Sequence, residues 1–173
     1  MSPTHPVPRP PLSLYGRPGF MIRRAHQIAV SVFMHETAEH GVTPTQFGIL
    51  DLLRHRPGID QITLARLLGL DRSTTGMVVK TLETAHLVVR ITDASDKRRR
   101  TLGLTPEGLL LLDRLQTPAA QAVEALLRPL SPRERTTFLR LLGKLTAAFN
   151  ATARVPLLAV ADPNGADAAP PDP

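Results

Sequence analysis

Apolar side chains recur every three or four positions through the middle of the chain, which is the spacing of amphipathic α-helices. Pro44, Pro106 and Pro132 each follow a Thr or Ser, so each marks a helix start with a capping hydroxyl and a proline at the first helical position. Pro118 falls inside the fifth helix and is expected to bend it. The pattern predicts six helices, at residues 19–40, 43–55, 60–68, 71–85, 105–128 and 131–152.

The pattern changes between the fourth and fifth helices. Leu87–Ile91 is short and rich in β-branched residues, and Thr101–Leu104 alternates between polar or small and apolar residues. These two segments predict a hairpin whose tip carries the sequence "DASDKRRR". The expected fold class is therefore mainly α with a small β-hairpin, in an α+β arrangement of about six helices.

Prolines concentrate near both ends of the chain. Residues 1–17 and 156–173 cannot build regular helices or central strands, and they are expected to be flexible tails. The 173 residues include 42% hydrophobic ones, enough for one core. We therefore expect a single domain at residues 18–155.

The net charge of +6 favours polyanionic partners. Only 3% of residues are aromatic, which argues against single-strand binders and for duplex DNA. The chain has no cysteine, which excludes disulfides and thiolate metal sites. No segment approaches the ~20 apolar residues that span a bilayer, and no targeting sequence opens the chain, so we expect a cytoplasmic protein without a membrane partner.

Two consecutive short helices form the candidate DNA-reading unit. In the first, the apolar face is predicted to comprise Ile62, Leu64, Ala65, Leu67 and Leu68. After a turn at Gly69, Asp71 caps the second helix, where the predicted inward residues are Met77, Val78 and Leu82.

The first turns of this second helix carry short polar or cationic side chains. Arg72, Ser73, Thr74 and Thr75 suit close approach to phosphates and base edges, and Lys80 lies two turns further along, within reach of the DNA backbone. The alternative is that the three hydroxyl residues only favour a helix N-terminus. The basic hairpin that follows supports the DNA-binding interpretation, because a helix-turn-helix with a wing is a composite reader.

The run "LARLLGLDRSTTGMVVKTLETAHLVVRITDASDKRRRTLGLTPEG" resembles the winged helix-turn-helix of the multiple antibiotic resistance regulator (MarR) family. The family's wing pattern is Asp, two residues, Asp, any residue and Arg, followed after a short strand by Leu-Thr-x-x-Gly. The matching residues are Asp93, Asp96, Arg98, Leu104, Thr105 and Gly108.

The resemblance implies a homodimer whose dimerisation layer consists of the first, fifth and sixth helices. It also implies a recognition helix that begins at Asp71, supported by Gln61 and Thr63 on the preceding helix. Two such helices enter successive major grooves when they lie about 34 Å apart, so the expected partner is a pseudo-palindromic operator in double-stranded DNA. An effector that fixes another spacing would release the DNA, which makes repression the default expectation and leaves activation open.

The resemblance also divides the wing cations by role. Arg98 matches the Arg that enters or borders the minor groove, and Asp96 matches the acid that holds it. Lys97 and Arg99 are expected to touch phosphates. The role of Arg100 stays open between a DNA contact and a position on the strand.

Family members of this kind commonly respond to small molecules, and the first helix offers a candidate site. Arg23 and His26 are neighbours on one helix face, where they suit the carboxylate and a ring substituent of an aromatic acid. Arg24 is the second choice for the carboxylate contact. The apolar stripe beside them comprises Ile22, Ala25, Ala29, Val32 and Phe33. Interfacial salt bridges for both arginines, with a half-buried His26, are the alternative.

Other functional classes lack support in the sequence. His35 and His40 are five residues apart and share no helix face, so no metal site is expected. No cofactor is expected, and the chain has neither a Gly-rich phosphate loop nor an acid pair in an apolar setting, which argues against an enzyme. The competing interpretations are a winged-helix architectural protein without effector control and, with less support, a metal-responsive regulator.

Overall fold

The computed structural model describes residues 13–92 and 100–158. Within them the chain forms six α-helices and one two-stranded antiparallel sheet, which confirms the predicted fold class. The helices are α1 (Pro18–Glu36), α2 (Pro44–His55), α3 (Gln61–Leu68), α4 (Arg72–Thr84), α5 (Pro106–Leu127) and α6 (Pro132–Ala148). The strands are β1 (Val88–Thr92) and β2 (Arg100–Leu104), and the 3-10 turns are η1 (Leu14–Gly16), η2 (Ala38–His40) and η3 (Asn150–Thr152).

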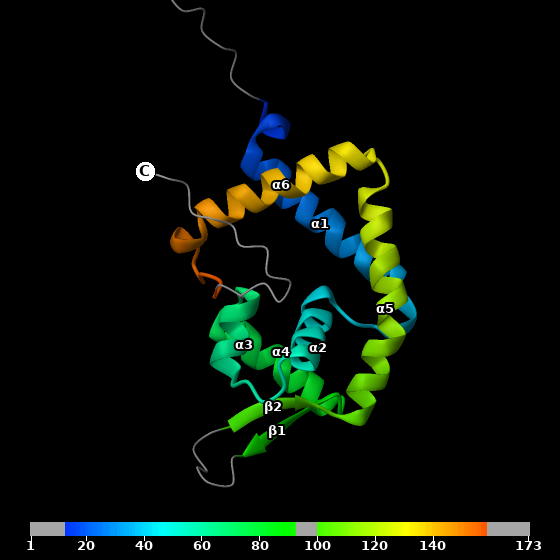
Figure 1. Cartoon of the computed structure of the whole chain (residues 1–173), viewed down its shortest axis with the longest axis vertical. Helices are drawn as coiled ribbons and strands as arrows, with labels where there is room; N and C mark the ends of the chain where they lie inside the picture. Colours follow the sequence, from blue (N-terminus) through cyan, green and yellow to red (C-terminus); the bar gives the residue numbers. More distant parts are fainter. Residues whose placement is uncertain (1–12, 93–99, 159–173) are drawn as a thin grey trace, which may run out of the picture.

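Helices α2, α3 and α4 and the hairpin form one lobe, and α5 leads away from the hairpin to α6 (Figure 1). Helix α1 packs against α5, and the two form a layer beside the lobe (Figure 1). Among the described helices, none combines the length and the apolar character that a membrane crossing requires.

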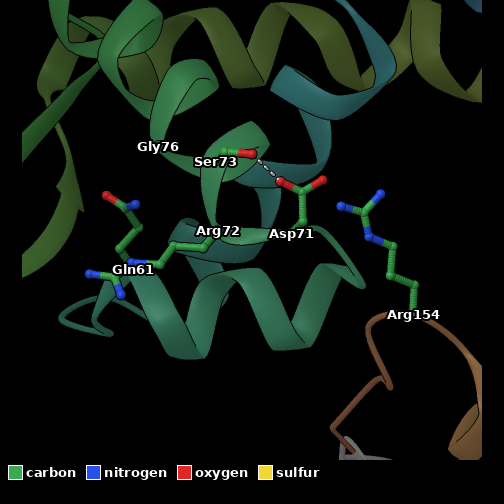
Figure 2. A pocket seen from close by; sticks show the side chains of 6 residues that line it. All are labelled: Gln61, Asp71, Arg72, Ser73, Gly76 and Arg154. Atoms are coloured by element: carbon green, nitrogen blue, oxygen red, sulfur yellow. Dashed lines mark hydrogen bonds between the residues drawn. The ribbon is translucent and has the colours of Figure 1, made fainter.

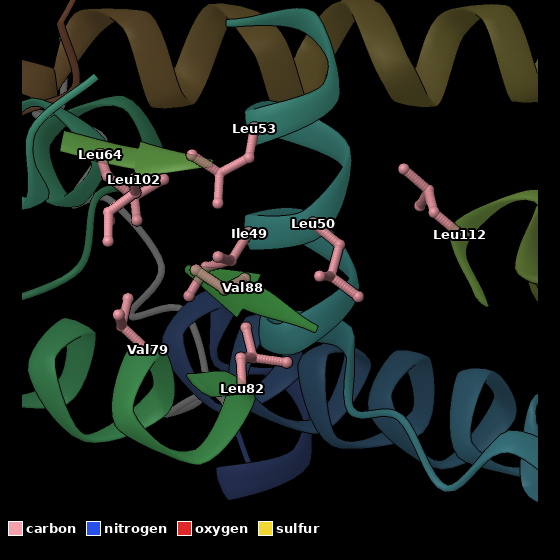
Figure 3. Close-up of a cluster of buried hydrophobic side chains, with 9 residues drawn as sticks. All are labelled: Ile49, Leu50, Leu53, Leu64, Val79, Leu82, Val88, Leu102 and Leu112. Carbon is pink, nitrogen blue, oxygen red and sulfur yellow. The ribbon is translucent and has the colours of Figure 1, made fainter. Parts of the chain in front are cut away.

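One cluster of buried side chains joins the elements of the lobe (Figure 3). Its members are Ile49, Leu50 and Leu53 of α2, Leu64 of α3, Val79 and Leu82 of α4, Val88 and Leu102 of the hairpin, and Leu112 of α5. Because the hairpin and the helix-turn-helix share this core, the base of the wing is fixed relative to α4.

Three of the predicted helix starts are confirmed by their hydrogen bonds. The hydroxyl of Thr43 accepts from the backbone N–H of Gln46 at 3.2 Å, and the Gln46 side chain accepts from the Thr43 N–H at 2.8 Å. At α6, Glu134 accepts from the Ser131 N–H at 2.8 Å and from its hydroxyl at 2.7 Å. The Thr105 hydroxyl accepts from the N–H of Gly108 at 3.0 Å. Apart from the bond between the Ser131 hydroxyl and Glu134, each contact satisfies an N–H that lacks a partner inside its helix.

The first helix is shorter than predicted. It ends at Glu36 rather than at residue 40, because the buried Thr37 directs its hydroxyl to two carbonyl groups, those of Phe33 at 2.8 Å and Val42 at 3.3 Å. Gly41 then adopts the left-handed conformation with φ of 61°. The chain therefore turns back toward α2 one helical turn earlier than the apolar pattern indicates.

The hairpin pairs Val88 with Leu104 at its base and Thr92 with Arg100 at its open end. The close approach of the Leu87 carbonyl explains why a glycine, Gly108, follows the hairpin. A side chain at this position would collide with the carbonyl oxygen of Leu87, so α5 can pack against the base of β1 only with glycine here.

The structure describes a few residues on either side of the predicted domain bounds. Residues 14–16 form η1, and the backbone N–H of Leu158 donates to the carbonyl of Arg66 at 3.1 Å. The chain after residue 155 thus returns to α3. Helix α5 runs through Pro118 without interruption.

Candidate nucleic-acid interface

Helix α3 and its turn set the position of α4, the predicted recognition helix. Asp60 caps α3 by accepting from the backbone N–H groups of Ile62 and Thr63, each at 2.8 Å, and from the Thr63 hydroxyl at 3.2 Å. Gly69 ends α3 in the left-handed conformation with φ of 64°. The Thr63 hydroxyl is therefore already bonded to Asp60. Ile62 was predicted to face inward but is 60% exposed, because the buried face of α3 is formed by Leu64 and Ala65.

Asp71 organises the start of α4 (Figure 2). Its carboxylate accepts from the Ser73 hydroxyl at 2.6 Å and from the N–H and hydroxyl of Thr74 at 2.9 Å and 2.8 Å. These hydrogen bonds hold the pKa of Asp71 well below its usual range, and the bond from Ser73 has the largest effect on it. The carboxylate thus stays ionised and fixes both hydroxyl groups.

The residues predicted to contact DNA at the start of α4 divide into two groups. Arg72, Ser73 and Lys80 are exposed, as a DNA-contacting surface requires. Thr74 is half-buried, and its hydroxyl is already bonded to Asp71. Thr75 is fully buried, and its hydroxyl donates to the Asp71 carbonyl at 2.9 Å, so its predicted contact with DNA is wrong in this conformation.

Met77 shows the opposite error. It was predicted to face inward, but it is 66% exposed. The buried positions of α4 are Thr75, Val79 and Leu82, spaced four and three residues apart, and Met77 lies on the other side of that helix. A shallow groove there is lined by Met77, Lys80, Thr81, Thr84 and Ala85.

A second open groove lies at the junction of α3 and α4 (Figure 2). It is lined by Gln61, Asp71, Arg72, Ser73, Gly76 and Arg154. Gly76 lets Gln61 approach α4, since a β-carbon here would lie 3.2 Å from the Gln61 amide nitrogen. Arg154 comes from the segment after α6, and nothing in the local sequence indicated this neighbourhood.

The wing tip lies outside the described residues, and with it the predicted DNA contacts of Asp96, Lys97, Arg98 and Arg99. Arg100 is the first residue of β2, which places it on the strand.

The predicted effector residues lie on α1. Arg23, Arg24 and His26 are all exposed, and the Arg23 guanidinium carbon lies 5.1 Å from the centre of the Phe20 ring. Phe20 in turn makes an edge contact with Tyr15, at 5.3 Å between ring centres. The three polar residues therefore occupy an open helix surface beside an aromatic pair. In the described chain no group of three or more metal-binding side chains is assembled.

In sequence, the chain is similar to a set of transcriptional regulators. A sequence profile of the MarR family matches residues 40–99, which span the helix-turn-helix and much of the wing. The putative transcriptional regulatory protein for the hcr operon of Thauera aromatica is 36% identical over 134 residues, covering 77% of this chain and 81% of that protein.

Two solved structures share the fold along most of its length. CouR, a transcriptional repressor solved with a 23-mer DNA duplex, has 30% identity and a TM-score of 0.72, with 77% of this chain and 94% of that chain covered. BpsR of Bordetella bronchiseptica, described as regulated in its DNA binding by 6-hydroxynicotinic acid, has 26% identity and a TM-score of 0.74. Its alignment covers 79% of this chain and 98% of BpsR.

Proposed function

Because this chain belongs to the MarR family of transcriptional regulators, we propose that it binds a pseudo-palindromic operator as a homodimer and represses transcription until an aromatic carboxylate releases it. The observation that carries the proposal is the exposed face of α4. Arg72, Ser73 and Lys80 form a cationic and polar surface on a helix whose other side is anchored in the core. CouR, which has the same fold, was solved on a DNA duplex.

The dimer is supported by what one protomer leaves uncovered. Helix α6 buries none of its own residues, yet it exposes a row of large apolar side chains. They are Phe138, Leu139, Leu141, Leu142 and Leu145, continued after the helix by Phe149. An apolar surface of this kind favours pairing with a second copy, and homodimers are typical of the family.

The wing adds contacts beside the recognition helix. Arg98 is proposed to border the minor groove with Asp96 holding its guanidinium, while Lys97 and Arg99 contact phosphates. Gln61 is proposed to support the recognition helix from α3. These roles follow the family's pattern and the charge of the segment.

The effector is proposed to be an aromatic carboxylate. BpsR responds to 6-hydroxynicotinic acid, which is a compound of this chemical class. On α1, Arg23 offers a guanidinium beside an aromatic ring, and His26 lies one turn further along. Arg24 is the alternative partner for the carboxylate.

The test is a binding titration of the full chain against its own upstream region and against random duplex of equal length. Operator binding at least about 1000 times tighter than random binding supports a regulator, whereas near-equal affinities indicate an architectural protein. A thermal-shift screen of aromatic carboxylates then compares the native protein with Arg23→Ala and Arg24→Ala. The proposed effector site is contradicted if no compound in the screen stabilises the native protein, or if the compounds that do so stabilise both variants equally.

A further inference from the structure

We propose that the C-terminal arm (Asn150–Leu158) docks on the helix-turn-helix and holds Arg154 as an additional phosphate-contacting residue. The inference rests on the proposed DNA-binding function and extends it to a segment beyond the helix-turn-helix and the wing. Three observations carry it: the arm is closed on itself, it is bonded to α3, and its cation reaches the groove at the start of α4.

The arm is held in a loop by one side chain. The side-chain Nδ2 of Asn150 donates to the Leu157 carbonyl at 3.1 Å, and the Leu157 N–H donates to the side-chain Oδ1 of Asn150 at 2.8 Å. Both backbone groups of Leu157 are thus bonded to a residue of η3, directly after α6. This pair of bonds limits the positions that the intervening residues can adopt.

The end of this loop docks on the turn between α3 and α4. The Leu158 N–H donates to the Arg66 carbonyl at 3.1 Å. The Leu157 side chain lies over Gly69, where a β-carbon would be 3.2 Å from its methyl group. The glycine that makes the turn therefore also leaves room for the arm, which is seen reaching α3 from the end of α6 (Figure 1).

Docking brings Arg154 to the groove from the side opposite to Arg72. Figure 2 shows the Arg154 guanidinium extended toward Asp71, with Gln61 and Arg72 across the groove. Among the described residues Arg154 makes no direct hydrogen bond or ion pair, and its positive charge acts on the Asp71 carboxylate at longer range. The Asp71 carboxylate already accepts from Ser73 and Thr74, so the guanidinium keeps its donors for a ligand.

The ligand that fits two exposed guanidinium groups beside a recognition helix is the phosphodiester backbone of duplex DNA. A guanidinium presents several N–H donors in a plane and binds phosphate oxygens in pairs. Such a contact carries no base information, so Arg154 is expected to strengthen binding to operator and random duplex alike. Each phosphate contact also contributes about 0.9 to the slope of log affinity against log salt.

The experiment measures that slope with the operator fragment for the native chain and four variants. Arg154→Ala removes the cation, Arg154→Lys keeps it, and Asn150→Ala releases the arm while leaving Arg154 in the chain. Arg128→Ala is the matched control, because it removes the same charge from the exposed corner between α5 and α6, away from the helix-turn-helix (Figure 1). Amide hydrogen exchange of Leu157 and Leu158 reports docking of the arm independently of DNA.

Arg154→Ala and Asn150→Ala are expected to lower the slope by about 0.9 per protomer, with Arg154→Lys and Arg128→Ala unchanged. Leu157 and Leu158 should exchange faster in Asn150→Ala alone. A native slope in Arg154→Ala, or an equal loss in Arg128→Ala, overturns the role of Arg154 while leaving the operator-binding function intact. A native protein that binds no duplex DNA overturns the proposed function itself, and with it the phosphate contact.

Discussion

Arg90 of β1 is paired with Glu83 in the last turn of α4, with its Nε lying 2.9 Å and 3.0 Å from the two carboxylate oxygens. Both side chains are about 30% exposed, so the pair is only partly shielded from solvent. It connects the strand that leads into the wing with the helix proposed to read the major groove. The orientation of the wing is therefore tied to that of α4 by a charged contact as well as by the shared core.

Replacing Glu83 with Gln should lower the free energy of unfolding by less than about 1 kcal/mol, because a partly exposed ion pair contributes little to stability. The same change should weaken operator binding more than it weakens binding to random duplex, since only operator binding needs the wing and α4 in register. Urea unfolding and binding titrations measure the two effects. Equal changes in affinity for both DNAs would show that Glu83 does not act through the register of the wing and α4.

The cap at Asp71 predicts an acid-dependent loss of stability. Its pKa is lowered in the folded chain, so its contribution is complete above the ordinary Asp pKa of about 4 and is lost as the pH falls toward the folded pKa. Asp71→Asn lacks this titration. Between pH 5 and pH 2, on the order of three pH units, the native protein should lose more unfolding free energy than the variant. Parallel curves in urea unfolding at a series of pH values would contradict this account.

Substitutions at Thr75 and Met77 should affect different properties, namely the stability of the fold at Thr75 and the preferred DNA sequence at Met77. Thr75→Ala removes a buried hydroxyl and its bond to the Asp71 carbonyl, so it should lower the free energy of unfolding by about 1 to 3 kcal/mol. Met77→Ala changes an exposed side chain and should leave that free energy within about 0.5 kcal/mol of native.

In return, Met77→Ala should alter the preferred operator sequence at one or more thymines, because an exposed apolar side chain on α4 suits the thymine methyl group. Selection of binding sites from a random duplex pool measures the preference, with Met77→Leu as the control that keeps an apolar contact. An unchanged preference in Met77→Ala would remove Met77 from the reading surface.

Gly108→Ala tests how closely α5 packs against the residue before β1, and Gly143→Ala in α6 is its control. Gly108→Ala brings a methyl group onto the Leu87 carbonyl and should lower the free energy of unfolding by about 1 to 3 kcal/mol, as overpacking does. Gly143 lies within α6 with open space around it, so Gly143→Ala should raise helix stability by about 0.5 to 1 kcal/mol. Thermal unfolding of both variants at one protein concentration makes the comparison, and a neutral Gly108→Ala would require α5 to shift.

Local signals explain why so much of the fold was predictable. Thr43 and Thr105 accept from N–H groups three residues further on, and Glu134 accepts from the N–H of Ser131 three residues back, so a helix start can be identified from a short run of sequence. The hairpin was predictable for the same reason, because its strands are close in the chain and differ in composition from the helices around them.

The errors come from contacts that no short run encodes. The rotation of α4 about its axis is set by what Val79 and Leu82 meet in α2 and the hairpin, and that rotation decides that Thr75 is covered and Met77 is not. Arg154 is more than 80 residues from Asp71 in sequence, and only the docking of the arm brings them together.

The apolar surface of α6 makes protein concentration part of the behaviour of this molecule. Because α6 buries no residue within its own protomer, association in the proposed homodimer would supply most of the free energy that keeps this helix folded. The melting temperature should then rise as the protein is concentrated. In a cell, the amount of regulator would decide how many protomers are paired and therefore how much of the protein can occupy both halves of an operator at once.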